Sequence, residues 1–378
     1  ILGGMGADTI STGSGTDTVL GDNGIVQMDA AGLHFASIAT YTQPAITDLG
    51  GNDNITALDG VKIVLGGDGI DTINLGVGSA TASNHIVIGD NGSIAYVAGT
   101  DLPLSYQTTD TVTTTGGGDT INTGSGNNVI LGGMGADTIS TGSGTDTILG
   151  DNGIVQMDAE GVKPVSVTST QLGISGTNLT TTGNDIIVAG DGTKTVVGGD
   201  GSDGVTLGLG GHVVAGDNAQ ITYVDAGAGQ PVNDGKLLSV TTLDTVTSTG
   251  DGDTITLGDG NNVVLAGMGA DSITTGVGTD TILGDNGIVQ MDAQGGNLAQ
   301  ISTYSQPSTG GSLTDLGGND TIAGGTGDKA VLGGDGTDSI TLSTGNHTVV
   351  GDNGTVTYVA LGQAGAGNIL SYSTTDTL

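Results

Sequence analysis

The sequence Gly3-Gly-Met-Gly-Ala-Asp-Thr-Ile-Ser11 is followed at once by Thr12-Gly-Ser-Gly-Thr-Asp-Thr-Val-Leu20, so one nine-residue pattern is written twice in succession. We number its positions as slots one to nine. Glycines at slots two and four, such as Gly13 and Gly15, allow positive φ and a close approach of the backbone. Slot six supplies a carboxylate, and slot eight an Ile or Val that suits a short strand with one inward side chain. The pattern therefore predicts turns and strands that alternate along a coil.

The composition limits the core and the partners of this chain. Its 378 residues include 76 glycines and a single Phe, so we expect a long, thin core of Ile, Val and Leu rather than a large globular one. The formal net charge of −35 excludes nucleic acid and anionic membrane surfaces as partners and implies that cations are part of the fold. No apolar run is long enough for a membrane span, and no signal-peptide pattern opens the chain. The absence of Cys excludes disulfides and thiolate metal sites, which fits a secreted protein with another kind of staple.

A longer repeat is superimposed on the nonapeptides. Residues 1–30 return almost unchanged as residues 130–159 and 264–293, and each long repeat contains two related modules. A module has four nonapeptides, a Gly-Asp-Asn turn, an alternating strand and a variable loop. Met modules are named after Met5, Met134 and Met268, and Lys modules after the lysines described below. The predicted modules with their loops span residues 1–46 (partial Met), 47–109 (Lys), 110–182 (Met), 183–243 (Lys), 244–317 (Met) and 318–378 (Lys and the start of the next repeat). We expect one continuous solenoid that is a stretch of a longer array.

Slot six, read in order, carries the most specific signal. In the full Met modules it reads Asp, Asn, Asp, Asp, and in the Lys modules it reads Asp, Lys, Asp, His. The Met-module residues are Asp8 and Asp17, then Asp119, Asn128, Asp137 and Asp146, then Asp253, Asn262, Asp271 and Asp280. The Lys-module residues are Asp53, Lys62, Asp71 and His85, then Asp185, Lys194, Asp203 and His212, then Asp320, Lys329, Asp338 and His347. Slot eight is Ile or Val beside all of them, so the phase of the repeat is secure.

These residues resemble the RTX (repeats-in-toxin) nonapeptide GGxGxDxUx of secreted bacterial proteins. Residues 66–74 and 132–140 match that motif in full, and the other nonapeptides match it in phase. The resemblance implies an all-β fold, a right-handed parallel β-roll or β-solenoid of stacked nonapeptide half-turns with inserted loops. It also implies multiple calcium ions, bound between successive turns on each edge of the roll.

Calcium is the ion that this set of ligands favours. The turns offer only carboxylates and backbone carbonyls, and flexible glycine loops suit the six to eight oxygen ligands of calcium better than the strict octahedron of magnesium or the nitrogen and sulfur preference of zinc. The predicted ligands are the slot-six aspartates Asp8, Asp17, Asp53, Asp71, Asp119, Asp137, Asp146, Asp185, Asp203, Asp253, Asp271, Asp280, Asp320 and Asp338. Further candidates are the Gly-Asp-Asn aspartates Asp22, Asp90, Asp151, Asp217, Asp285 and Asp352, together with Asp110 and Asp244. The Gly-Asp-Asn aspartates either ligate the last calcium of a module or only cap the turn.

The basic slot-six residues call for a different role. If nonapeptides alternate, the first and third share one edge and the second and fourth share the other, where Lys is paired with His. We hypothesise that Lys62, Lys194 and Lys329 replace a calcium ion as built-in cations that hydrogen-bond turn carbonyls. The alternative is that these slots lost their ligand and the lysines point to solvent. His85, His212 and His347 occur once in each module, so we expect them to donate to turn carbonyls rather than to form a metal cluster.

The function that this pattern favours is structural and non-catalytic. No nucleophile, base and orienting group stand out, and the carboxylates form a ladder that lacks the broken symmetry of an active site. We expect a secreted, extracellular or cell-surface stalk, fibre, filament or biofilm-matrix component that self-associates end to end or laterally, with loops 31–46, 160–182 and 295–314 decorating its shaft. The alternatives are an adhesin spacer or ice-binding repeat, and the folding and secretion module of a toxin or hydrolase.

Overall fold

The fold was analysed in a computed structural model that describes residues 1–41, 50–76, 82–110, 115–170, 183–225, 227, 235–244, 250–303 and 317–375. Every regular element among these residues is a β-strand. The described residues include no helix of the length and apolarity needed to cross a membrane. The chain divides into two compact units, Ile1–Pro164 with Ser169–Thr195, and Val165–Thr168 with Val196–Leu378, and each is described by itself.

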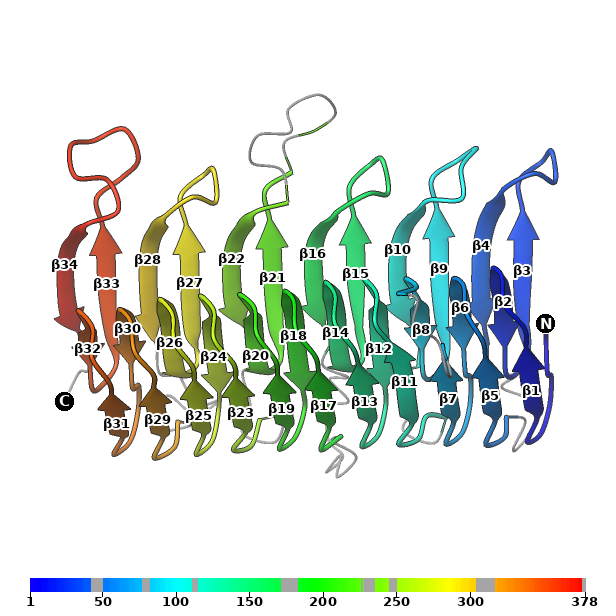
Figure 1. The fold of residues 1–378 in the computed structure, drawn as a ribbon, viewed down its shortest axis with the longest axis horizontal. Helices are drawn as coiled ribbons and strands as arrows, with labels where there is room; N and C mark the ends of the chain where they lie inside the picture. The colour runs from blue at the N-terminus through cyan, green and yellow to red at the C-terminus, as the bar shows by residue number, and fades with distance from the viewer. Residues whose placement is uncertain are drawn as a thin grey trace, which may run out of the picture. The chain divides into compact units, whose positions relative to one another are not determined.

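Each unit contains three kinds of sheet (Figure 1). Strands of the first and third nonapeptides form a parallel odd sheet, and strands of the second and fourth form a parallel even sheet. Strands that follow the Gly-Asp-Asn turns form an antiparallel hairpin sheet with their return strands. The all-β, parallel β-roll architecture predicted from the sequence is thereby confirmed.

The strands of the first unit are short, in keeping with a nine-residue repeat. The odd sheet contains β1 (Thr9–Thr12), β5 (Asn54–Ala57), β7 (Thr72–Leu75), β11 (Thr120–Gly124), β13 (Thr138–Thr141) and β17 (Ile186–Ala189). The even sheet contains β2 (Asp17–Leu20), β6 (Lys62–Leu65), β8 (Ile86–Ile88), β12 (Val129–Gly133) and β14 (Asp146–Asp151). The hairpin sheet contains β3 (Gly24–Met28), β4 (Phe35–Thr40), β9 (Gly92–Tyr96), β10 (Pro103–Thr108) and β15 (Gly153–Met157). Strands β16 (Pro164–Ser169) and β18 (Lys194–Gly199) have residues in both units.

The second unit repeats the same plan. Its odd sheet contains β19 (Gly204–Leu207), β23 (Thr254–Leu257), β25 (Ser272–Thr275), β29 (Thr321–Gly324) and β31 (Ser339–Leu342). Its even sheet contains β20 (Val213–Asp217), β24 (Val263–Gly267), β26 (Asp280–Asp285), β30 (Lys329–Leu332) and β32 (Thr348–Val350). Its hairpin sheet contains β21 (Ala219–Tyr223), β22 (Leu237–Thr242), β27 (Gly287–Met291), β28 (Leu298–Thr303), β33 (Gly354–Tyr358) and β34 (Ile369–Thr374).

The core consists of columns of slot-eight residues that stack in register. In the odd sheet of the first unit the column is Ile10, Ile55, Ile73, Ile121, Ile139 and Ile187. In the odd sheet of the second unit it is Val205, Ile255, Ile273, Ile322 and Ile340. Most of these side chains are fully buried, and burial of each such side chain contributes about 1.5–3 kcal/mol. The inward orientation predicted for slot eight is confirmed.

Each complete module contributes two strands to each of its three sheets. In the Lys module of the first unit, β5 and β7 lie in the odd sheet, β6 and β8 in the even sheet, and β9 and β10 in the hairpin sheet. Because neighbouring strands lie about 4.8 Å apart in any sheet, the three sheets advance by the same step along the stack. A hairpin after every two coils therefore keeps all three ladders in phase.

One prediction from the sequence was wrong. Residues 31–46, 160–182 and 295–314 were expected to be variable loops, but β4, β16 and β28 lie within them as return strands. Their alternation was hidden because an inward position at the strand end is hydroxylic. The Thr40 Oγ1 accepts a hydrogen bond from the Gly92 N–H at 2.9 Å, and the Thr303 Oγ1 accepts one from the Gly354 N–H at 3.0 Å. Residues 42–46, 171–182 and 304–314 of these loops lie outside the described residues.

Candidate calcium-binding edges

The turns that precede the odd strands form a ladder of carboxylates, which we call the odd edge. The Asp53 N–H donates to Asp71 Oδ1 at 2.8 Å, the Asp71 N–H to Asp119 Oδ1 at 2.7 Å, and the Asp119 N–H to Asp137 Oδ1 at 2.6 Å. In the second unit the same bonds join Asp203, Asp253, Asp271, Asp320 and Asp338 in sequence. One oxygen of each slot-six carboxylate thus caps the backbone of the preceding rung.

The second carboxylate oxygen has a different environment. Among the described residues, a buried Oδ2 accepts no hydrogen bond at Asp8, Asp53, Asp71, Asp119, Asp137, Asp271 and Asp320. A buried oxygen without a partner costs about 1–3 kcal/mol, and more when it carries charge. These oxygens therefore need a ligand that the polypeptide itself does not supply.

Glycines that open the third nonapeptide or the Gly-Asp-Asn turn lie close to these oxygens. A Cβ placed on Gly66 would overlap both Asp71 Oδ2 and the carbonyl oxygen of Gly89. A Cβ on Gly89 would overlap Asp119 Oδ2 and the carbonyl oxygen of Gly132 in the same way. Each of these glycines therefore allows one carboxylate oxygen and one carbonyl oxygen to approach the backbone closely, and both are ligands that calcium prefers.

The electrostatics of the odd edge also favour a cation. Burial, followed by the charge of Asp119, raises the pKa of Asp71 to about 9. Burial likewise raises the pKa of Asp53 to about 6 and that of Asp320 to about 7. Burial and the neighbouring carboxylates hold the pKa of Asp137 well above its usual range. A divalent ion between rungs would reverse this effect, because an opposite charge stabilises the ionised carboxylate.

The donor set fits calcium and does not fit a transition metal. Among the described residues, no three His, Cys, Asp or Glu side chains converge as a metal cluster, because each turn contributes a single carboxylate. A calcium ion at this edge would be held by slot-six carboxylates and backbone carbonyls of neighbouring turns, and its charge would neutralise the carboxylates.

The Gly-Asp-Asn aspartates lie at the start of the hairpins and act as caps. Asp22 Oδ2 accepts from the Asp68 N–H at 2.7 Å, and Asp90 Oδ1 accepts from the Gly117 N–H at 3.2 Å. Asp217 and Asp285 accept from the N–H groups of Met268 and Asp335. Burial raises the pKa of Asp22 to about 8 and that of Asp285 to about 9. Asp22, Asp217 and Asp285 also keep a buried Oδ1 that accepts no hydrogen bond among the described residues.

The remaining candidates beside these turns differ from one another. Asp110 is engaged by its own chain, because it accepts from the Asn91 N–H at 2.9 Å and from Thr115 Oγ1 at 2.6 Å. Asp244 Oδ1 accepts from Asn218 Nδ2 at 3.1 Å. Asp151 is buried, whereas Asp352 is exposed. These contacts give Asp110 and Asp244 structural roles beside the turns.

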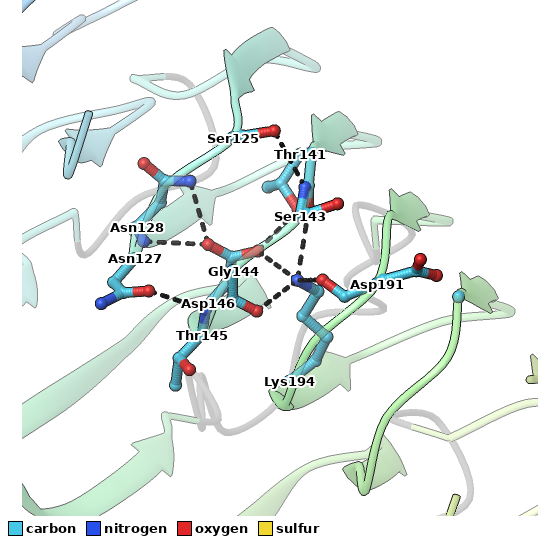
Figure 2. A network of polar contacts seen from close by, with 12 residues as sticks. Ser125, Asn127, Asn128, Thr141, Ser143, Gly144, Thr145, Asp146, Asp191 and Lys194 are labelled. Atoms are coloured by element: carbon cyan, nitrogen blue, oxygen red, sulfur yellow. Dashed lines mark hydrogen bonds and ion pairs between the residues drawn. The ribbon is translucent and has the colours of Figure 1, made fainter. Parts of the chain in front are cut away.

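The turns that precede the even strands, which we call the even edge, are arranged differently. The predicted ligands Asp17, Asp146 and Asp280 each pair with a lysine ammonium from the next module, at 2.7, 2.9 and 2.8 Å. Figure 2 shows Lys194 directed at Asp146 and Gly144, with the backbone of Asp191 beside it. The sequence placed Lys and His together on this edge and predicted that the ammonium donates to turn carbonyls, as it does at Gly15, Gly144 and Gly278. Because the Lys side chain is long, the ammonium also reaches the aspartate of the preceding rung. The nearest signal in the sequence was that each Lys follows an Asp of a Met module on this edge.

Histidine and asparagine nitrogens occupy other rungs of the even edge. His212 Nε2 lies 3.1 Å from the carbonyl oxygen of Gly208, and His347 Nε2 lies 2.8 Å from that of Ser343. Since a carbonyl only accepts, each of these nitrogens carries the proton. His85 Nδ1 accepts from the Lys62 N–H at 3.2 Å, and burial, followed by the charge of Lys62, lowers the pKa of His85 to about 4.

Comparison with known proteins identifies the repeat. The family model described as the RTX calcium-binding nonapeptide repeat matches residues 1–25, 110–153, 179–211, 247–282, 258–291 and 314–349. No curated protein and no solved structure matches the chain.

Proposed function

This chain is built from RTX calcium-binding nonapeptide repeats, and we propose that it is a calcium-braced structural shaft, a segment of a stalk, fibre or filament outside the bacterial cell. RTX repeats bind several calcium ions and form β-roll modules of proteins that are typically secreted. Extracellular calcium modules bind with Kd of roughly 10⁻⁴ to 10⁻³ M. Their sites are filled outside the cell and empty in the cytosol, so calcium couples folding to secretion.

The observation that carries this proposal is the ladder of the odd edge. The rungs repeat one hydrogen bond, one buried Oδ2 and one closely approaching glycine, in both units. A catalytic or substrate-binding site is confined to one place, whereas this arrangement recurs from rung to rung along the odd edge. Such uniformity suits an element whose task is to extend and resist bending, because each added module lengthens the stack without changing its cross-section.

The test is the calcium dependence of the length of the molecule. Small-angle X-ray scattering and circular dichroism on the whole chain should show an extended β-rich particle in millimolar calcium and an expanded, less ordered chain in EGTA. Negative-stain electron microscopy of the same samples tests self-association into fibres, which is part of the proposal. A compact or unchanged particle in both conditions would refute the shaft.

One further observation favours a second candidate, a face that binds ice or another regular surface. The outward positions of the odd sheet in the second unit carry two columns of mainly hydroxylic residues. Paired rungs place Thr254 beside Ser272 and Thr256 beside Thr274, and these side chains are exposed. Thermal hysteresis with the whole chain would support this candidate, and its absence would leave the shaft alone.

A further inference from the structure

The three buried lysines share one set of oxygen partners. The Lys62 ammonium donates to the carbonyls of Gly13 and Gly15 at 3.0 and 2.6 Å and to Asp17 Oδ2 at 2.7 Å. The corresponding partners of Lys194 are Gly142 at 3.2 Å, Gly144 at 2.7 Å and Asp146 at 2.9 Å. Those of Lys329 are Gly276 at 3.4 Å, Gly278 at 2.6 Å and Asp280 at 2.8 Å. Slots two, four and six of one nonapeptide therefore hold the ammonium each time.

This set consists of the hard oxygen ligands that calcium takes, two carbonyls and a carboxylate. A second carbonyl-bearing turn also contributes, through the Asp59 carbonyl at 3.2 Å from Lys62 and the Asp191 carbonyl at 3.1 Å from Lys194. The ammonium thus lies between two successive turns and contacts both. The side chains of all three lysines are 0% exposed, so the alternative in which they point to solvent does not hold for this structure.

The same Met module provides the contrast between the two edges. On the odd edge, Asp137 Oδ2 accepts no hydrogen bond among the described residues. On the even edge, Asp146 Oδ1 accepts from the N–H and Nδ2 of Asn128, both at 2.9 Å, and Oδ2 accepts from Thr141 Oγ1 at 2.8 Å and pairs with Lys194. Asp280 shares the two bonds from Asn262 to its Oδ1 and the ion pair with Lys329, but its Oδ2 accepts no hydrogen bond among the described residues. What distinguishes the even edge is therefore a cation of the chain itself, which pairs with each of these carboxylates.

We propose that the lysine ammonium takes the place of calcium at these three positions, so that the even edge is closed by the nitrogens of the chain and calcium is confined to the odd edge. A charge buried at this depth is stable only when its partners are present, and the lysine is part of the chain, so its presence does not depend on the calcium concentration. The even edge therefore keeps its cations at calcium concentrations at which the odd edge loses its calcium ions. The shaft would have one calcium-dependent and one calcium-independent side.

The decisive variant is Lys194→Asp. It would give the even edge the Asp–Asp arrangement of Asp137 and Asp185, in which the Asp137 N–H donates to Asp185 Oδ1 at 2.7 Å. In wild type, the Asp146 N–H donates to the carbonyl of Thr193 at 3.2 Å. With the ammonium removed and a carboxylate added, the variant should bind one more calcium ion than wild type, counted by native mass spectrometry and calorimetry on the whole chain. The control is Lys236→Asp, which changes the charge equally at an exposed lysine and should leave the count unchanged.

A second measurement applies even if Lys194→Asp folds poorly. Crystals of the wild-type protein grown in calcium should show anomalous density beside the odd-edge carboxylates and none beside Lys62, Lys194 or Lys329. A calcium peak in contact with a lysine ammonium would overturn the proposal. A well-folded Lys194→Asp variant with the wild-type calcium count would overturn it as well.

Discussion

Replacing Asp71 by Asn should stabilise the calcium-free protein and weaken its response to calcium. In the calcium-free state at pH 7 the Asp71 carboxyl is protonated, because burial and the charge of Asp119 raise its pKa to about 9. Asn keeps an acceptor oxygen for the Asp53 N–H, which donates at 2.8 Å in the wild type. It takes up no proton, and it provides no anionic ligand for calcium.

The magnitude follows from the cost of that protonation. A carboxyl with an ordinary pKa of 3.8 binds a proton at pH 7 at a cost of about 1.4 kcal/mol for each pH unit between the two values, or roughly 4 kcal/mol. Removing this cost should raise the free energy of unfolding in EGTA by at most about 4 kcal/mol. Loss of one site that is filled at a hundred times its Kd should lower the calcium-dependent gain by about 2.7 kcal/mol.

Urea unfolding followed by circular dichroism, in EGTA and in saturating calcium, measures both quantities at pH 7. The matched control is Asp251→Asn, because Asp251 is exposed and the same charge is removed. Asp71→Asn should raise the urea midpoint in EGTA and narrow the gap between the two conditions, whereas the control should do neither. A lower midpoint in EGTA would mean that the ionised carboxylate stabilises the fold without calcium, contrary to this prediction.

Three other predictions follow from the same structure. The pKa values of Asp53 and Asp71 are raised to about 6 and 9, so the folded calcium-free state binds more protons than the unfolded chain and should lose stability as pH rises from about 4 through 9. Calcium binding at pH 7 should therefore release protons, and calorimetric heats that do not depend on the ionisation enthalpy of the buffer would contradict this. Gly132→Ala places a Cβ against Asp137 Oδ2 and the Gly150 carbonyl and should lower the calcium count, whereas Gly13→Ala, with open space around its Cβ, should not. Equal counts in native mass spectra would argue against these two oxygens as calcium ligands. Ile139→Ala, in the stacked column between Ile121 and Ile187, should lower the free energy of unfolding by about 2–5 kcal/mol, measured by thermal unfolding with calcium present. Ile186→Ala, at a 53% exposed position, should lower it far less, and similar losses for both would exclude the slot-eight core.

The sequence was sufficient to predict the coil and its phase. Slot eight is Ile or Val in every nonapeptide, and a residue such as Ile73 must point inward if the glycine turns before it are to face outward. Gly67 and Gly69, at slots two and four, have φ of 115° and 123°, as the turn requires. Local repetition therefore determined both the strand and its inward face.

Other features depend on contacts between rungs, which a local pattern does not specify. Return strand β4 was missed because its inward Thr40 is matched to a backbone N–H of a later strand rather than to an apolar core. Lys62 was expected to donate to turn carbonyls, and it donates to those of Gly13 and Gly15. Its ion pair with Asp17 on the preceding rung was not foreseen, because the sequence pattern placed only His85 beside it. The type of group at each slot could be read from the sequence, whereas the partner of each group is determined by how the rungs stack.

The most direct test of the account is an anomalous difference map from crystals grown in calcium. Peaks should lie between successive rungs of the odd edge, each within about 2.3–2.6 Å of a slot-six carboxylate oxygen. A map without peaks beside Asp71, Asp119 and Asp137 at millimolar calcium would contradict it.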